Sequence, residues 1–227
     1  MTTTETSLDR LAALDPAFAG MAGATARHVR AIPELTDREK TFLCVTADVC
    51  QASLGLAFAA HVRAGLAAGV STMDIRALLR FVSYDCGYHA ATAGIERIAE
   101  LEAELGINPE LADAEPVPAG PSPLPDEVRA RLTELDPQFT EYFDLQSGMR
   151  AGHGPGTLSE RERGLVSLSV DLHYQTLADT FRIHVGRALR GGASPEDVRA
   201  ALRFNAQFGV TRAWHAWEAL NTILAGS

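Results

Sequence analysis

Two histidine–aspartate combinations are the residues whose types and spacing most directly suggest chemistry. Asp48 lies thirteen residues before His61, and Asp171 lies thirteen residues before His184. A histidine exchanges protons near neutral pH, and a carboxylate behind the ring can orient it and support its protonated form. The sequence therefore suggests general acid/base catalysis by His61 or His184, with the aspartate as a positioning residue. The alternative is structural, with a hydrogen-bonded core histidine and a loop or capping aspartate in each pair.

Other polar and aromatic side chains could form a substrate pocket. His173 is a third candidate for proton transfer. Arg212 is the candidate for binding a carboxylate, because a guanidinium pairs with it through two hydrogen bonds. Trp214 either packs against other helices or lines the pocket of an aromatic substrate. The remaining candidates, which could equally face solvent, are Tyr84, His89, Tyr174 and Asn205.

The spacing of possible metal ligands does not match a metal site. The chain has 7 histidines, but no His-Glu-x-x-His motif and no two histidines four residues apart. Cys44 and Cys50 are six residues apart, which is the spacing of neither a redox pair nor a zinc site. We therefore expect no metal and interpret these cysteines as core thiols.

Composition and charge exclude several functional classes. The 227 residues are 46% hydrophobic, and the net charge of −9 argues against binding nucleic acid or an anionic membrane. The apolar stretch from Leu54 to Val70 contains His61 and Arg63 and is too short and too polar to span a bilayer. No secretory signal is recognisable, and three cysteines without framework spacing fit a reducing compartment. We expect a soluble, cytoplasmic protein that acts on a small molecule.

The elements that must position these residues come in two copies. An offset of 123 residues aligns Asp48 with Asp171 and His61 with His184. Agreement over many residues of different chemistry indicates a duplication. We predict a first repeat over residues 1–107, a proline-rich linker over residues 108–125, and a second repeat over residues 126–227. The same offset aligns Thr36–Lys40, Gly69, Ser71, Asp74, Arg76, Leu79 and Phe81 with Ser159–Arg163, Gly192, Ser194, Asp197, Arg199, Leu202 and Phe204.

Each repeat has the residue pattern of helices. Thr36 and Ser159 are suited to cap a helix, and each is followed three residues later by a glutamate, which is a capping-box pattern. Gly69 and Gly192 are suited to end one. The alternation typical of strands is absent, so the sequence predicts an all-α fold. One apolar stripe of helical period consists of Ile75, Leu78, Leu79 and Val82, with Asn205 at the last position in the second repeat.

A common motif runs through both repeats. In the first repeat it is carried by Arg38–Lys40, His61–Leu66, Gly69–Ser71 and Gly87–Ala91, and in the second by Arg161–Arg163, His184–Leu189, Gly192–Ser194 and Gly209–Ala213. This motif resembles that of the carboxymuconolactone decarboxylase and alkylhydroperoxidase D-like superfamily, over two stretches of roughly 65 residues. The resemblance implies an all-helical fold that assembles as trimers or hexamers.

The chain departs from the peroxidase class of that superfamily. This class has a Cys-x-x-Cys pair before the histidine and a glutamate further upstream. Peroxide reduction needs an attacking thiolate and a resolving partner nearby, so disulfide-cycling peroxidase activity is disfavoured. The cysteine positions are occupied by Leu54 and Ala57 or by Leu177 and Thr180, and the glutamate positions by Phe42 and Leu165.

The decarboxylase class keeps the histidine and uses neither a metal nor an organic cofactor. The resemblance therefore implies a cofactor-free lyase or isomerase acting on a carboxylated lactone or keto acid, in aromatic-compound or natural-product metabolism. The rival interpretation is a non-catalytic ligand-binding or scaffold protein on the same fold. The resemblance also implies a homo-oligomer, in which the two repeats of each chain pack about a pseudo-twofold axis and three chains form a six-domain ring.

Overall fold

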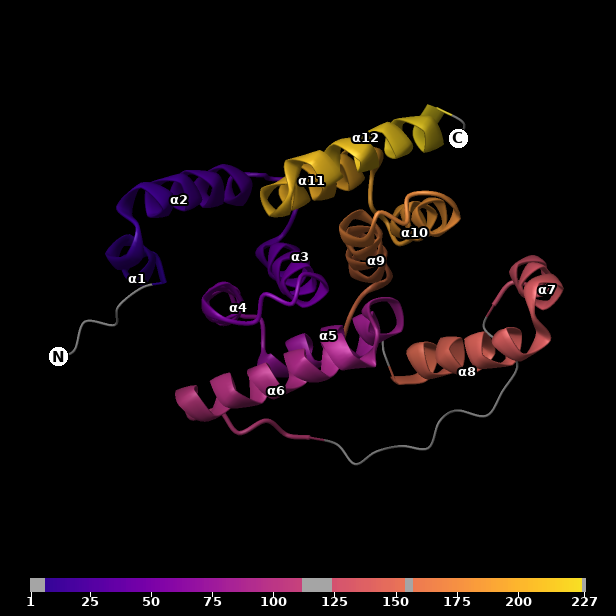
Figure 1. The fold of residues 1–227 in the computed structure, drawn as a ribbon, viewed down its shortest axis with the longest axis horizontal. Coiled ribbons are helices and arrows are strands. Elements are labelled where there is room, and N and C mark those ends of the chain that lie inside the picture. Colours follow the sequence, from indigo (N-terminus) through magenta and orange to yellow (C-terminus); the bar gives the residue numbers. More distant parts are fainter. Residues whose placement is uncertain (1–6, 112–123, 154–156, 226–227) are drawn as a thin grey trace. The chain divides into compact units, whose positions relative to one another are not determined.

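The computed structural model describes residues 7–111, 124–153 and 157–225, which form helices joined by short connections (Figure 1). These residues contain no β-strand, so the all-α prediction is confirmed. Most of the predicted linker, residues 112–123, lies outside the described part. The helices are α1 (Ser7–Leu14), α2 (Pro16–Arg30), α3 (Asp37–Cys50), α4 (Leu56–Ala67), α5 (Thr72–Cys86), α6 (Tyr88–Leu105), α7 (Asp126–Leu135), α8 (Pro137–His153), α9 (Glu160–Tyr174), α10 (Asp179–Arg190), α11 (Pro195–Asn205), the 3₁₀ helix η1 (Ala206–Phe208) and α12 (Val210–Ala225).

Helix boundaries lie where the capping residues predict them. Thr36 Oγ1 accepts a hydrogen bond from the backbone N–H of Glu39, and the Glu39 carboxylate accepts one from the N–H of Thr36, which closes the capping box of α3. Ser194 caps α11 in the same way, with Asp197 as its partner. Gly69 has a φ of +87°, a left-handed conformation that glycine adopts without strain just after α4.

The described residues form two compact units, and each unit takes helices from both halves of the sequence. The first unit contains α1–α4 and α9–α12, and the second contains α5–α8. The predicted repeats therefore do not correspond to the spatial units. The reason is tertiary packing, because α3 of the first half packs against α9 of the second half inside one hydrophobic core.

The core of the first unit is built on α9, which packs closely against α10. Leu165, Leu168 and Leu172 of α9 are fully buried among apolar side chains of α3, α10 and α11. Gly164 makes the close approach possible, since a Cβ atom there would collide with the backbone of Ala188 on α10. On the other side, Gly65 of α4 faces the side chain of Thr41 on α3. Small residues thus set how near each histidine-bearing helix, α4 or α10, lies to the helix that carries its aspartate.

The second unit is held by polar contacts as well as by its apolar stripe. Ile75, Leu78, Leu79 and Val82 of α5 are all buried, as their helical spacing predicts. Two of its polar contacts are the buried ion pair between Arg76 and Glu102, with Nε 3.0 Å from Oε1, and the Arg150 guanidinium over the rings of Phe81 and Tyr84.

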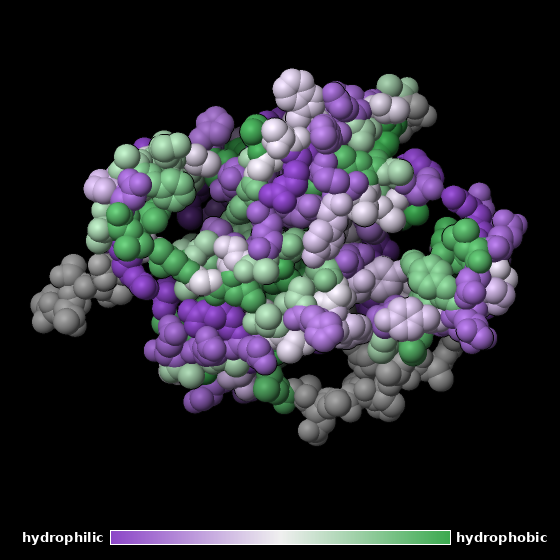
Figure 2. All heavy atoms as spheres, in the orientation of Figure 1, coloured by the Kyte–Doolittle hydropathy of each residue, from purple (hydrophilic) through white to green (hydrophobic). Residues whose placement is uncertain are grey.

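Several large apolar side chains are exposed on the first unit. Leu14 of α1 and Met21 of α2 are 80% and 68% exposed, and hydrophobic residues gather over these two helices in Figure 2. Within the described ranges, no helix has both the length and the apolar character needed to cross a membrane.

Candidate functional site

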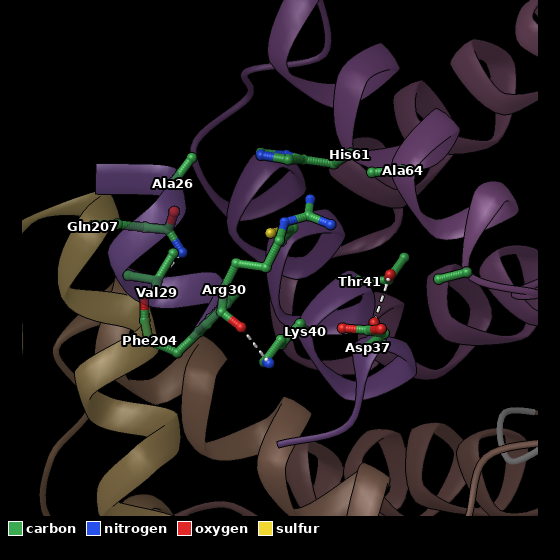
Figure 3. Close-up of a pocket in the computed structure, with 12 residues that line it drawn as sticks. Ala26, Val29, Arg30, Asp37, Lys40, Thr41, His61, Ala64, Phe204 and Gln207 are labelled. Atoms are coloured by element: carbon green, nitrogen blue, oxygen red, sulfur yellow. Dashed lines mark hydrogen bonds between the residues drawn. The ribbon is translucent and has the colours of Figure 1, made fainter. Parts of the chain in front are cut away.

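A cleft in the first unit brings together residues of α2, α3 and α4 with the end of α11 and the start of η1 (Figure 3). Its empty space is about 530 Å³, open solvent at its mouth included. We call it the α2–α4 cleft. Its lining residues are Ala26, Val29, Arg30, Asp37, Lys40, Thr41, Cys44, His61, Ala64, Ala68, Phe204 and Gln207.

The first predicted histidine–aspartate pair forms one wall of this cleft. His61 of α4 has its Nδ1 atom 2.7 Å from Oδ2 of Asp48 on α3. The Asp48 side chain is buried, whereas 26% of the His61 side chain is exposed. The ring of Phe208 in η1 meets His61 edge-on, with the two ring centroids 6.2 Å apart. The carboxylate thus fixes the imidazole from behind, while the ring borders the cleft.

The surroundings of this pair favour a protonated imidazole. Burial by itself lowers the pKa of His61, but hydrogen bonds with Asp48 and with Cys44 outweigh it and raise the pKa to about 10. Burial raises the pKa of the Asp48 carboxyl, and the bond with His61 opposes that effect. The pair therefore holds a proton at neutral pH, and His61 is suited to donate it.

The second predicted pair has the same geometry in a more closed setting. His184 Nδ1 of α10 lies 2.6 Å from Asp171 Oδ2 of α9, and the other oxygen of Asp171 accepts a hydrogen bond from Thr176. Only 10% of the His184 side chain is exposed, and it does not line the α2–α4 cleft. The structure thus brings both predicted pairs together but gives only His61 access to this cleft.

Of the residues that line the cleft, His61 alone was predicted from the sequence as part of a site, and the most consequential ones that were missed are Arg30, Lys40 and Cys44. Arg30 and Lys40 bring two positive charges, and Lys40 Nζ donates to the backbone carbonyl of Arg30 (Figure 3). Cys44, interpreted from its spacing as a core thiol, is only half-buried and lines the cleft beside His61. A signal for Cys44 was present, because it lies one helical turn before Asp48 on the same face of α3.

The other predicted binding residues do not line this cleft. Arg212 donates to the backbone carbonyl of Phe208 and to the side chain of Gln51. Asn205 is buried, with its amide bonded to Ser169 and to the carbonyl of Ala201. Tyr174 and Trp214 are 41% and 67% exposed in the first unit, and Tyr84 and His89 belong to the second unit.

His173 has an unusual environment for a predicted proton-transfer residue. It is 5% exposed and packs edge-on against Phe208, with 5.9 Å between ring centroids. Burial and the positive charge of Arg212 lower its pKa to about 4, against an opposing effect of Asn205. Neither ring nitrogen of His173 has a hydrogen-bond partner among the described residues. His173 is therefore neutral at pH 7.

The part of the chain that the structure describes contains no cluster of three His, Cys, Asp or Glu side chains arranged to hold a metal ion. The charged side chains that border the α2–α4 cleft, beside the His61 imidazole, are those of Arg30, Asp37 and Lys40.

Comparisons with known proteins agree with this architecture. Residues 137–222 match the carboxymuconolactone decarboxylase family. A crystal structure from Burkholderia xenovorans, of a protein described as a γ-carboxymuconolactone decarboxylase subunit, is similar to the chain with a TM-score of 0.56 and 23% identity, over 96% of this chain and 90% of that one. At this identity the likeness establishes a common fold and not a common activity. A search of curated proteins found no match. Residues 137–222 are thus similar to the carboxymuconolactone decarboxylase family, and the chain shares the fold of a protein described as a subunit of such an enzyme.

Proposed function

We propose that the protein is a cofactor-free lyase or isomerase that acts on a carboxylated lactone or keto acid in the α2–α4 cleft. The observation that carries this proposal is the Asp48–His61 pair, which borders a cleft that also contains Arg30 and Lys40. The family match over residues 137–222 and the fold shared with a protein described as a decarboxylase subunit add support.

The chemistry of such a reaction matches the groups in the cleft. Loss of CO₂ from a keto acid or a lactone acid leaves an enolate, which must receive a proton on carbon. His61 is protonated at neutral pH and can deliver that proton, while Asp48 stabilises its charge. Arg30 and Lys40 can bind either a carboxylate that the product retains or the oxygen atom of the enolate. An isomerisation would use the same donor and the same positive charges.

The proposal selects His61 and not His184. The equivalent of Thr41 in the second repeat is Gly164, and this residue allows α10 to lie in contact with α9. His184 and Asp171 are consequently more enclosed than His61 and Asp48. We assign the second pair a structural role, which makes His184 the matched control for every substitution at His61.

We also propose that the chain is a homo-oligomer, a trimer of two-repeat chains as the resemblance implies. The exposed apolar side chains of α1 and α2 support self-association, since such patches commonly mark interfaces. The mass of the native protein in solution, measured by light scattering, tests this point.

The function is tested by turnover of carboxylated lactones and β-keto acids by the purified, chelator-treated protein, followed by absorbance and CO₂ release. We expect metal-independent turnover that falls by about 10²-fold or more in His61→Gln and stays within about twofold in His184→Gln. Arg30→Gln should raise KM. Melting temperatures show whether each variant is folded. Turnover that is unaffected by His61→Gln would rule out this mechanism. Absence of turnover, combined with binding of the same acids, would favour a ligand-binding protein.

A further inference from the structure

The thiol of Cys44 extends the Asp48–His61 pair into a series of three interacting side chains. Cys44 lies one helical turn before Asp48 on α3, and it lines the α2–α4 cleft together with His61. The His61 ring is bonded through Nδ1 to the buried Asp48 carboxylate. A thiol and an imidazole backed by a carboxylate thus border one cleft, which is the set of groups that supports a cysteine nucleophile.

The accessibility of Cys44 distinguishes this arrangement from a purely structural one. Cys44 is half-buried, and both it and His61 line the α2–α4 cleft. At the equivalent position of the second repeat stands Ser167, which is completely buried near the more enclosed His184. Of these two positions, only Cys44 offers its nucleophilic atom to a ligand.

The other two cysteines of the chain provide a comparison for the reactivity of Cys44. Burial, and then the charge of Asp85, raise the pKa of Cys86 to about 12, so this residue remains a thiol at neutral pH. Cys50, at the end of α3, is partly exposed but does not line the cleft. A thiol reagent should therefore distinguish the three positions.

We propose that Cys44 is a nucleophile that adds covalently to conjugated, unsaturated carboxylates bound in the α2–α4 cleft, with His61 as its proton partner. In this step the thiol proton leaves to solvent and the sulfur bonds to the β-carbon of the ligand. The π electrons of the double bond move to the α-carbon, where the protonated His61 imidazole delivers a proton, and His61 is then reprotonated from solvent. The product is a thioether that contains every atom of the ligand, so no leaving group and no oxidant is needed.

The cleft has the composition that this ligand class requires. Arg30 and Lys40 supply positive charge for the carboxylate, whereas Ala26, Val29 and Phe204 supply apolar surface for the carbon skeleton. The inference deepens the proposed function and rests on its cleft, because an unsaturated carboxylated lactone belongs to the same class of ligand, but it does not depend on turnover.

The test uses two matched electrophiles on the full chain, monoethyl fumarate and diethyl fumarate, which differ in one carboxylate. Adduct formation is followed by mass spectrometry of the intact protein and of its peptides, and each rate is divided by the rate of the same reagent with glutathione. We expect monoethyl fumarate to modify Cys44 about tenfold or more faster than Cys50 and Cys86, with a mass increase equal to the whole reagent.

Variants then test the role assigned to each neighbour. His61→Gln should slow the modification of Cys44 by about tenfold or more, and His184→Gln should leave it within about twofold. Arg30→Gln should reduce the preference for the monoacid over the diester without changing the rate with the diester. Asp48→Asn, checked for folding by its melting temperature, provides a second route to the same conclusion if His61→Gln does not fold.

The outcomes separate this inference from the proposed function. Equal rates at the three cysteines, or a Cys44 rate that is insensitive to both His61→Gln and Asp48→Asn, would overturn the inference. Rapid, His61-dependent modification of Cys44 in a protein that turns over none of the acids would support the inference and contradict the lyase proposal. Turnover without selective modification of Cys44 would contradict the inference and support the lyase proposal.

Discussion

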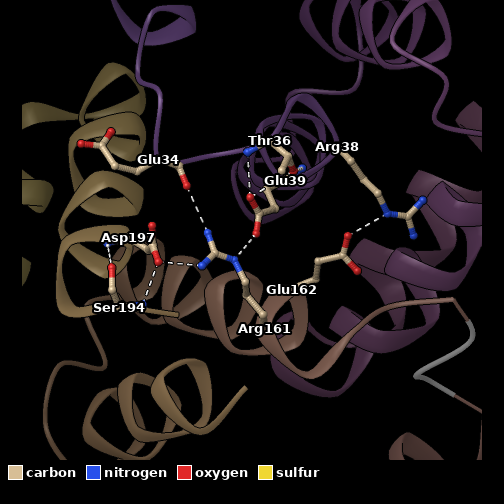
Figure 4. Close-up of polar contacts among 8 residues, drawn as sticks. All are labelled: Glu34, Thr36, Arg38, Glu39, Arg161, Glu162, Ser194 and Asp197. Atoms are coloured by element: carbon tan, nitrogen blue, oxygen red, sulfur yellow. Dashed lines mark hydrogen bonds and ion pairs between the residues drawn. The ribbon is translucent and has the colours of Figure 1, made fainter. Parts of the chain in front are cut away.

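The Nε atom of Arg38 donates a hydrogen bond to the Glu162 carboxylate at 2.7 Å, and the repeat equivalents of these residues form the reciprocal pair (Figure 4). Arg161 Nε donates to the Glu39 carboxylate at 2.6 Å. Each glutamate follows one of the arginines directly in sequence, and each ion pair joins α3 to α9. Such an exchange of equivalent partners is what a local twofold relation between the two helices would produce. It supports the proposed pseudo-twofold arrangement of these two helices within the first unit.

The two ion pairs should differ in their contribution to stability. Arg161 also donates to Asp197 and to the carbonyl of Glu34, and its partner Glu39 is only 5% exposed. Arg161→Met leaves a buried carboxylate without its counter-charge, so we expect a loss of about 3–5 kcal/mol in the free energy of unfolding. Arg38→Met removes a more exposed guanidinium (30% against 23%) from a carboxylate that is 10% exposed, so its cost should be smaller, about 1–2 kcal/mol. Urea unfolding measures both, and equal losses would contradict the assigned difference.

Asparagine substitutions at the two aspartates should separate catalysis from stability. Asp48→Asn keeps a side chain of similar shape behind His61 but removes the negative charge that supports the imidazolium. We expect kcat on an accepted substrate to fall by about 10–100-fold. Asp171→Asn should leave kcat within about twofold while lowering the melting temperature, because its partner His184 is buried. Similar effects of the two substitutions on kcat would argue against the choice of His61.

The pH dependence of turnover should report the acid role of His61. Its pKa of about 10 means that the imidazole remains protonated through neutral pH. The rate should therefore stay constant from about pH 7 upward and decrease as the pH rises through about 10. In Asp48→Asn the bond that raises this pKa is weakened while burial still lowers it, so the decrease should begin at lower pH. If the pH at which the turnover rate decreases is the same in Asp48→Asn as in the parent protein, the titrating group is not His61.

The close contact between α3 and α4 should be sensitive to a single methyl group. An added Cβ at Gly65 would collide with Cγ2 of Thr41, which lines the cleft. Gly65→Ala should therefore destabilise the protein by about 1–3 kcal/mol. Adding Thr41→Ser removes Cγ2 and retains the hydroxyl that donates to the Asp37 carbonyl, so the double variant should regain most of the loss. If the double variant does not regain stability, the contact with Thr41 Cγ2 is not the cause of the destabilisation.

Much of the fold could be predicted because it depends on local signals. The capping box at Thr36, the glycines after α4 and α10, and the spacing of each histidine to its aspartate are all visible in the sequence. The grouping of α5 and α6 with α7 and α8 could not be predicted from the sequence, because it depends on packing between residues far apart in the chain. Local periodicity carries no information about which helices share a core.

The cleft was only partly predictable for a similar reason. Arg30 and Lys40 resemble ordinary solvent-facing charges until α2 and α3 are placed together. Arg212 looked suitable for a carboxylate, but its guanidinium is engaged by the Phe208 carbonyl and by Gln51. The alignment of Cys44 with Ser167, two small side chains with a nucleophilic atom, was a usable signal. Its meaning depended on knowing that the first position borders a cleft and the second is buried.

His173 should make the protein sensitive to mild acid. Its folded-state pKa of about 4 lies below the ordinary 6.5, so the stability linked to the neutral ring is complete above pH 6.5 and is lost as the pH falls toward 4. His173→Leu removes this titration and two unpartnered ring nitrogens. Relative to the parent protein, the variant should gain about 2 kcal/mol between pH 7.5 and pH 5. Unfolding at both pH values measures the gain, with His28→Leu at an exposed site on α2 as the control. An equal response of the two variants to acid would mean that His173 is protonated in the folded protein.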